Sequence, residues 1–70
     1  MYLAVLHTYC EVYAIGGTEE DAKNNIVKGY KKTYPRKEDR SVNPVTFDAL
    51  HDYFGVAIYK IPLSVGYAHE

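Results

Sequence analysis

The residues that could form a covalent bond to a substrate are the single cysteine, Cys10, and the serines and threonines, with three histidines available as bases: His7, His51 and His69. A nucleophile of this kind works only when a base lies within hydrogen-bond reach. On an extended strand, His7 and Cys10 are an odd number of positions apart and point to opposite faces, unless the chain turns between them. We therefore interpret the chain as a non-enzyme, and a small enzyme built on Cys10 and a histidine, or on the paired Asp48 and Asp52, is kept as the weakest alternative.

Metal binding and hydrolysis both need side chains that converge on one point. The histidines, the cysteine and the acids show no spacing typical of a metal site, and His51 and Asp52 are adjacent on a predicted helix, where they diverge. Asp48 and Asp52 are four positions apart on that helix and could form a carboxylate pair, but a solvated helix face is the expected role. The sequence predicts neither a metal nor a cofactor.

A glycine pair, Gly16 and Gly17, stands between an apolar run and a predicted helix. Nucleotide-binding proteins place a phosphate at such a junction, because the first N–H groups of a helix have no internal partner. Here Thr18 is the expected N-cap, and three acids follow it at positions 19–21. They would repel an anion and no lysine follows the glycines, so we interpret the pair as a strand-to-helix bend.

The charges are strongly segregated along the chain. Residues 23–40 hold seven of the eight bases and two acids, a charge of +5, whereas the remainder holds one base and seven acids, a charge of −6. The acids in the first turn and the bases in the last turn of the predicted helix complement its dipole. The bases beyond the helix end have no such explanation, which makes this region the candidate site.

The predicted binding site combines these bases with two nearby aromatic rings: Tyr30, Lys31, Lys32, Tyr34, Arg36, Lys37 and Arg40. One expected partner is a protein with an acidic surface, which the bases would attract. The alternative is a nucleotide or another phosphorylated small molecule held between the subunits of an oligomer, with a tyrosine ring stacking on it. Duplex nucleic acid is not expected, because the net charge is −1.

The elements that must position this site follow from the apolar pattern and the turn residues. Residues 2–15 are β-rich and form either one long strand or a hairpin, with the hairpin slightly favoured. Elsewhere the pattern predicts a helix over 18–34 that Pro35 ends, a charged loop over 35–45, a short helix capped by Thr46 and ended by Gly55, a strand over 56–61, and an edge strand or docking tail over 63–68.

This order predicts one small α+β domain covering residues 1–70. It consists of a two- to four-stranded, mainly antiparallel sheet with two helices packed on one face, in the order β-(β)-α-α-β. The other face would be open and available to a partner. No segment reaches the roughly 20 apolar residues that a membrane span needs, and we expect a cytoplasmic protein because one cysteine cannot form an internal disulfide.

The composition favours binding as the function. The chain has 70 residues, 47% of them apolar, and eight tyrosines. Because so small a core is marginally stable, we expect a homo-oligomer. Tyrosine suits surfaces that are wet when free and buried in a complex. The sequence therefore predicts a non-enzymatic interaction protein that binds, and could inhibit, a macromolecular partner, a kind of protein typical of phages and other mobile elements.

Overall fold

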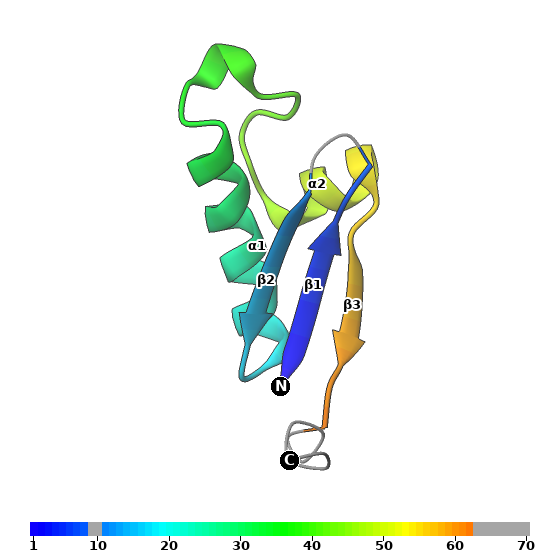
Figure 1. Ribbon diagram of the computed structural model, residues 1–70. Helices are drawn as coiled ribbons and strands as arrows, with labels where there is room; N and C mark the ends of the chain where they lie inside the picture. Colours follow the sequence, from blue (N-terminus) through cyan, green and yellow to red (C-terminus); the bar gives the residue numbers. More distant parts are fainter. Residues whose placement is uncertain (9–10, 63–70) are drawn as a thin grey trace.

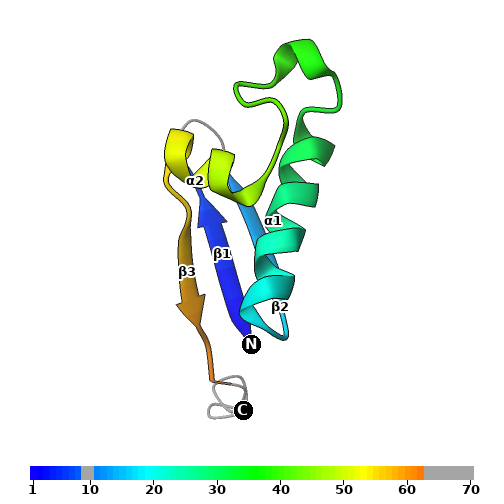
Figure 2. The ribbon, with the colours of Figure 1, turned by 180° about the vertical axis from the view of Figure 1, so that it is seen from behind.

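Three strands form a single antiparallel sheet in the computed structural model, which describes residues 1–8 and 11–62. The strands are β1 (Tyr2–Leu6), β2 (Val12–Gly16) and β3 (Ala57–Lys60), and their order in the sheet is β2-β1-β3. Two helices, α1 (Glu19–Thr33) and α2 (Phe47–Phe54), connect β2 to β3 and cover one face of the sheet (Figures 1 and 2). The predicted α+β fold and element order are confirmed.

The hairpin is the correct interpretation of residues 2–15. β1 and β2 pair antiparallel, with Leu3 opposite Ile15 and Val5 opposite Tyr13, and β3 pairs with the other edge of β1. The predicted strand over 56–61 is thus confirmed in a slightly shorter form. The predicted edge strand or tail over 63–68 lies outside the described residues.

Helix α1 begins and ends where the sequence predicts. The Thr18 hydroxyl accepts a hydrogen bond from the Asp21 N–H at 3.0 Å, and the helix ends just before Tyr34 and Pro35. At Gly29 an added Cβ would lie 2.9 Å from Cγ1 of Val12, so the missing side chain lets α1 approach β2 closely. Glycine costs about 1 kcal/mol relative to alanine in a helix, and here it leaves room for the Val12 side chain.

The glycine pair is a bend whose two members have different roles. A Cβ at Gly16 would collide with the backbone nitrogen of Ala22 and would lie 2.7 Å from Cβ of Asp21. The first turn of α1 therefore occupies the space beside Gly16 that a side chain would need. At Gly17 an added Cβ meets nothing within 4 Å. The close approach of strand end and helix explains Gly16 without a bound phosphate.

The segment between the helices was predicted as a charged loop, and it contains a short helical turn and two buried side chains as well. It contains a 3-10 turn, η1 (Lys37–Asp39), and returns to the core through Val42 and Val45, which are both buried. Helix α2 then begins at the Thr46 cap and ends at Gly55, whose φ of 81° is in the left-handed region that glycine favours. The sequence analysis missed the two valines because they lie apart in a polar stretch without periodicity.

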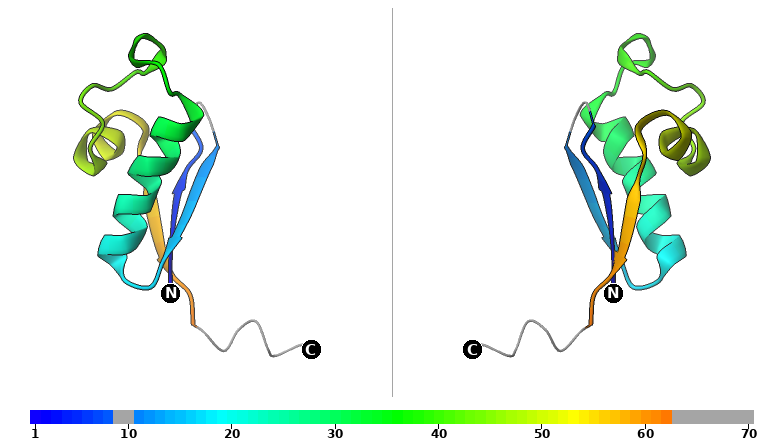
Figure 3. Two further views of the ribbon diagram at one scale, coloured as in Figure 1. Left: turned by 90° about the vertical axis from the view of Figure 1, so that its left-hand side faces the viewer. Right: turned by 90° about the vertical axis from the view of Figure 1, so that its right-hand side faces the viewer.

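One cluster of twelve buried residues joins the helices to the covered face of the sheet. Its largest fully buried side chains are Tyr30, Leu6, Ile26 and Leu50. Figure 3 shows the sheet edge-on, with both helices on one side and none of the described elements on the other. In the described part of the chain, neither helix has the length and apolar character needed to cross a bilayer.

Candidate binding surfaces

The predicted site at the carboxyl end of α1 is divided between core and surface. Tyr30 is 1% exposed, and its hydroxyl accepts the Ser41 N–H at 2.9 Å. Its ring packs against Tyr34 and Phe54, at centroid distances of 5.1 and 5.7 Å. Tyr30 therefore belongs to the core, and as placed it presents no ring to a ligand. Tyr34 is half-buried beside it.

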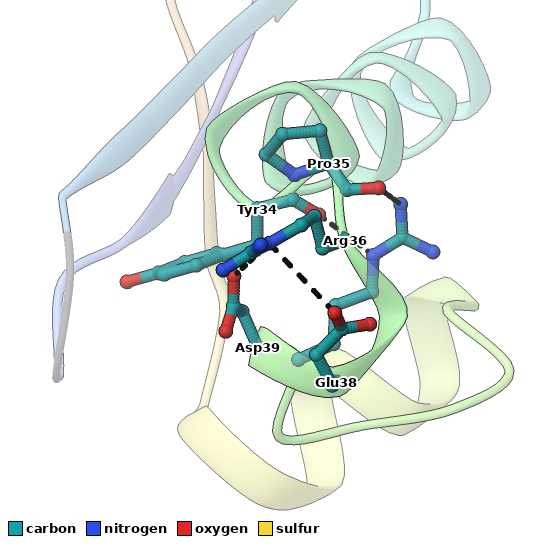
Figure 4. A network of polar contacts seen from close by, with 6 residues as sticks. Tyr34, Pro35, Arg36, Glu38 and Asp39 are labelled. Atoms are coloured by element: carbon teal, nitrogen blue, oxygen red, sulfur yellow. Dashed lines mark hydrogen bonds and ion pairs between the residues drawn. The ribbon is translucent and has the colours of Figure 1, made fainter.

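Both arginines of the predicted site make intrachain contacts, and Figure 4 shows Arg36 beside the two acids Glu38 and Asp39. Arg40 donates from Nε to the Tyr34 carbonyl at 2.7 Å and from Nη2 to the Pro35 carbonyl at 3.3 Å, which caps the end of α1. Arg36 donates from Nε to the Asp39 carboxylate at 3.2 Å and lies 3.8 Å from that of Glu38. The arginines therefore order residues 34–40, and two acids offset part of the charge.

The three lysines of the predicted site remain on the surface. Lys31, Lys32 and Lys37 are exposed, and none of them forms an ion pair with another of the described residues. These lysines are the part of the predicted cluster that could attract an acidic partner.

A groove between α1 and α2 continues the basic surface toward the start of α1. It has a volume of about 440 Å³ and is lined by Asn24, Val27, Lys28, Lys31, Val45, Thr46 and Phe47. Only Lys31 among these was predicted as a site residue. Asn24 and Lys28 could have been found from the spacing of positions 24, 28 and 31, which places three polar side chains on one helix face, whereas the lining residues from 45–47 depend on how α2 packs beside α1.

The open face of the sheet was expected, and the strand register shows which side chains make it. Alternation along the strands places six residues on the face opposite the helices: Leu3, Val5, Tyr13, Ile15, Ala57 and Tyr59. All six are apolar or aromatic. Tyr13 is 58% exposed, Ile15 54% and Tyr59 55%, whereas Val5 at the centre is only 9% exposed. We call these six residues the open sheet face.

Three of the residues that the sequence suggested for chemistry, Asp48, His51 and Asp52, lie exposed on α2. His51 Nδ1 lies 3.8 Å from Asp52 Oδ1 at the surface. Among residues 1–8 and 11–62, no group of three or more histidine, cysteine or acidic side chains is placed to hold a metal ion. Cys10 lies outside the described residues.

Comparisons with protein-family models, with curated proteins and with solved structures find no match to this chain. The described residues present two candidate binding surfaces, the open sheet face and the groove.

Proposed function

We propose that this chain is a non-enzymatic interaction protein that works by docking its open sheet face, and that the first occupant of this face is a second copy of the chain. The observation that carries the proposal is the uniform apolar character of that face, with three large side chains more than half exposed. The open face of a one-sided antiparallel sheet in solution is usually polar. An apolar one is typical of a surface that is covered in the working state.

The size of the exposed surface sets the expected strength of the contact. A large side chain has about 200 Å² of surface, so Tyr13, Ile15 and Tyr59 together expose roughly 300 Å² per copy. Two copies would remove roughly 600 Å² from water through these side chains, and their neighbours add to it. These three side chains alone fall below the roughly 1,000 Å² that a specific interface buries, so the rest of the face must be covered as well, and we expect a weak dimer whose Kd is in the micromolar range.

Self-pairing is favoured because the face is uncharged and meets itself without repulsion. A two-fold dimer brings the same patch of both copies together, and two sheets pack well with their strands about 30° apart. A chain of 70 residues with a small core also gains stability from such burial.

The dimer would leave the helix layer accessible, because the helices lie on the opposite side of the sheet (Figure 3). Lys31, Lys32 and Lys37 would then be free to attract the acidic surface of a protein partner, whose inhibition is one outcome of binding. The cytoplasm is the compartment proposed for this activity, since a single cysteine suits a reducing environment.

Sedimentation velocity tests the proposal on the full chain, from about 1 µM to about 500 µM, a range that brackets a micromolar Kd. The expected result is a shift from monomer to dimer as the concentration rises, unchanged by high salt because the interface is uncharged. A monomer at every concentration would exclude the second copy as occupant. Association that disappears in high salt would assign the contact to the lysines instead.

A further inference from the structure

The groove between α1 and α2 has the wall chemistry of a site for a small anion with an organic part. Lys28 and Lys31 are three positions apart on α1, so both ammonium groups stand on one wall. Both lysines are exposed, and neither pairs with an acid among the described residues. None of the seven lining residues is acidic.

Lys23, earlier on α1, differs from Lys28 and Lys31 in the partners of its charge. Its Nζ lies 3.8 Å from Glu19 and 5.1 Å from the centre of the Phe47 ring, so its charge already has two partners. The charges of Lys28 and Lys31 have no partner of either kind in the described chain. A ligand in the groove would therefore meet two positive charges that no acid among the described residues compensates.

The opposite wall adds the start of α2. The Thr46 hydroxyl accepts the Ala49 N–H at 3.1 Å, and the Thr46 carbonyl accepts the Leu50 N–H at 3.0 Å. The N–H groups of Phe47 and Asp48 have no partner inside the helix, so this end carries partial positive charge. Asp48, which directly follows the lining residue Phe47 in the sequence, is exposed and does not itself line the groove.

The remaining lining residues are apolar. Val27, Val45 and Phe47 supply a hydrophobic surface beside the cations, and Asn24 offers an amide that can donate or accept. A volume of about 440 Å³ is within the usual range for small-molecule sites. Doubly charged phosphate matches the paired ammonium groups, and a compact organic group matches the apolar part.

We propose that this groove binds a small phosphate monoester, with the phosphate between Lys28 and Lys31 and the organic group against Val27, Val45 and Phe47. This inference does not depend on the open sheet face, which lies on the other side of the sheet. It keeps the class of ligand expected from the sequence but moves the site about one helical turn toward the start of α1. It also replaces the buried Tyr30 with Phe47 as the aromatic wall.

Backbone amide NMR shifts of the full chain test this site, with AMP and glucose 6-phosphate as probes up to about 10 mM, ten times a weak Kd of 1 mM. Adenosine, glucose and inorganic phosphate are the matched probes that lack one half of the ligand. We expect saturable shifts from a monoester that centre on the lining residues, with weaker binding of every matched probe.

The variant K28Q/K31Q should weaken binding at least tenfold, whereas K32Q/K37Q removes the same charge outside the groove and should leave it nearly unchanged. Equal losses in the two double variants, or the absence of saturable shifts with both monoesters, would overturn the proposal. The phosphate monoester should still bind to the Y59K variant, which we expect to be monomeric. The dimer proposal and the groove proposal can therefore be refuted independently of each other.

Discussion

Replacing Tyr59 with lysine is expected to abolish dimer formation while leaving the fold intact. Tyr59 is 55% exposed on the open sheet face, which corresponds to about 110 Å² of a side chain of about 200 Å². At about 25 cal/mol per Å², covering it contributes at most about 3 kcal/mol per copy, because the costs of association offset part of this burial. The contribution counts twice in a symmetric dimer, so its upper limit is about 6 kcal/mol, and half of that already raises Kd by about 100-fold.

The matched control is Tyr53→Lys. Tyr53 is also 55% exposed, but it lies on α2 in the helix layer, where its ring packs edge-on against Phe54 at 4.7 Å. This change introduces the same charge and leaves the open sheet face untouched. We expect Tyr53→Lys to keep the dimer, with a loss of about 1 kcal/mol in folding stability from the broken ring contact.

Sedimentation velocity of the two variants beside the unchanged chain measures this difference, and thermal unfolding at low concentration checks the fold. A dimer that survives Tyr59→Lys would refute the assignment of the interface to the sheet. Equal weakening by both variants would show that added charge, rather than its position, disrupts the contact.

The remaining predictions concern the fold that positions these surfaces. Gly16→Ala should lower unfolding stability by about 1–3 kcal/mol or more, because the first turn of α1 fills the space for a Cβ, whereas Gly17→Ala should not create a clash. Denaturant unfolding compares the two, and an equally stable Gly16→Ala chain would contradict the packing. Tyr30→Phe should lower the free energy of unfolding by about 1 kcal/mol, because it removes the hydroxyl that accepts the Ser41 N–H. Denaturant unfolding measures this loss, and unchanged stability would show that the hydrogen bond does not stabilise the fold. Arg40→Gln should lower the free energy of unfolding by about 1 kcal/mol, because the side chain would no longer donate to the two carbonyls. Arg36→Gln should lower it by less than about 0.5 kcal/mol, because its ion pairs are exposed. A larger loss for Arg36→Gln than for Arg40→Gln would contradict these roles.

Local patterns predicted most of the fold because its elements begin and end at strong signals. Thr18 and Thr46 cap the helices, and Gly55 ends the second one with a positive φ. These signals act within a few residues, so they can be recognised in the sequence without knowing the tertiary structure. The choice between one strand and a hairpin could not be settled in this way, because it depends on pairing between Val5 and Tyr13 across a turn without a glycine signal.

The candidate site was harder to predict because long-range packing decides which side chains are exposed. Tyr30 continues the buried stripe of α1 and also looks like an aromatic beside a basic cluster, and only the return of the chain at Ser41 reveals which role it has. Arg40 likewise appears as a free cation until the carbonyls it caps are placed beside it. Phe47 lines the groove because residues 34–46 bring α2 alongside α1, a contact that no local pattern encodes.

Contacts between copies across the open sheet face test the central proposal most directly. In a mixture of isotope-labelled and unlabelled chain, filtered nuclear Overhauser spectra detect only proton pairs that belong to different copies. The proposal predicts intermolecular contacts among the side chains of Tyr13, Ile15 and Tyr59, which are the exposed members of the face. Intermolecular contacts confined to α1 and α2, or none at concentrations well above the micromolar range, would contradict it.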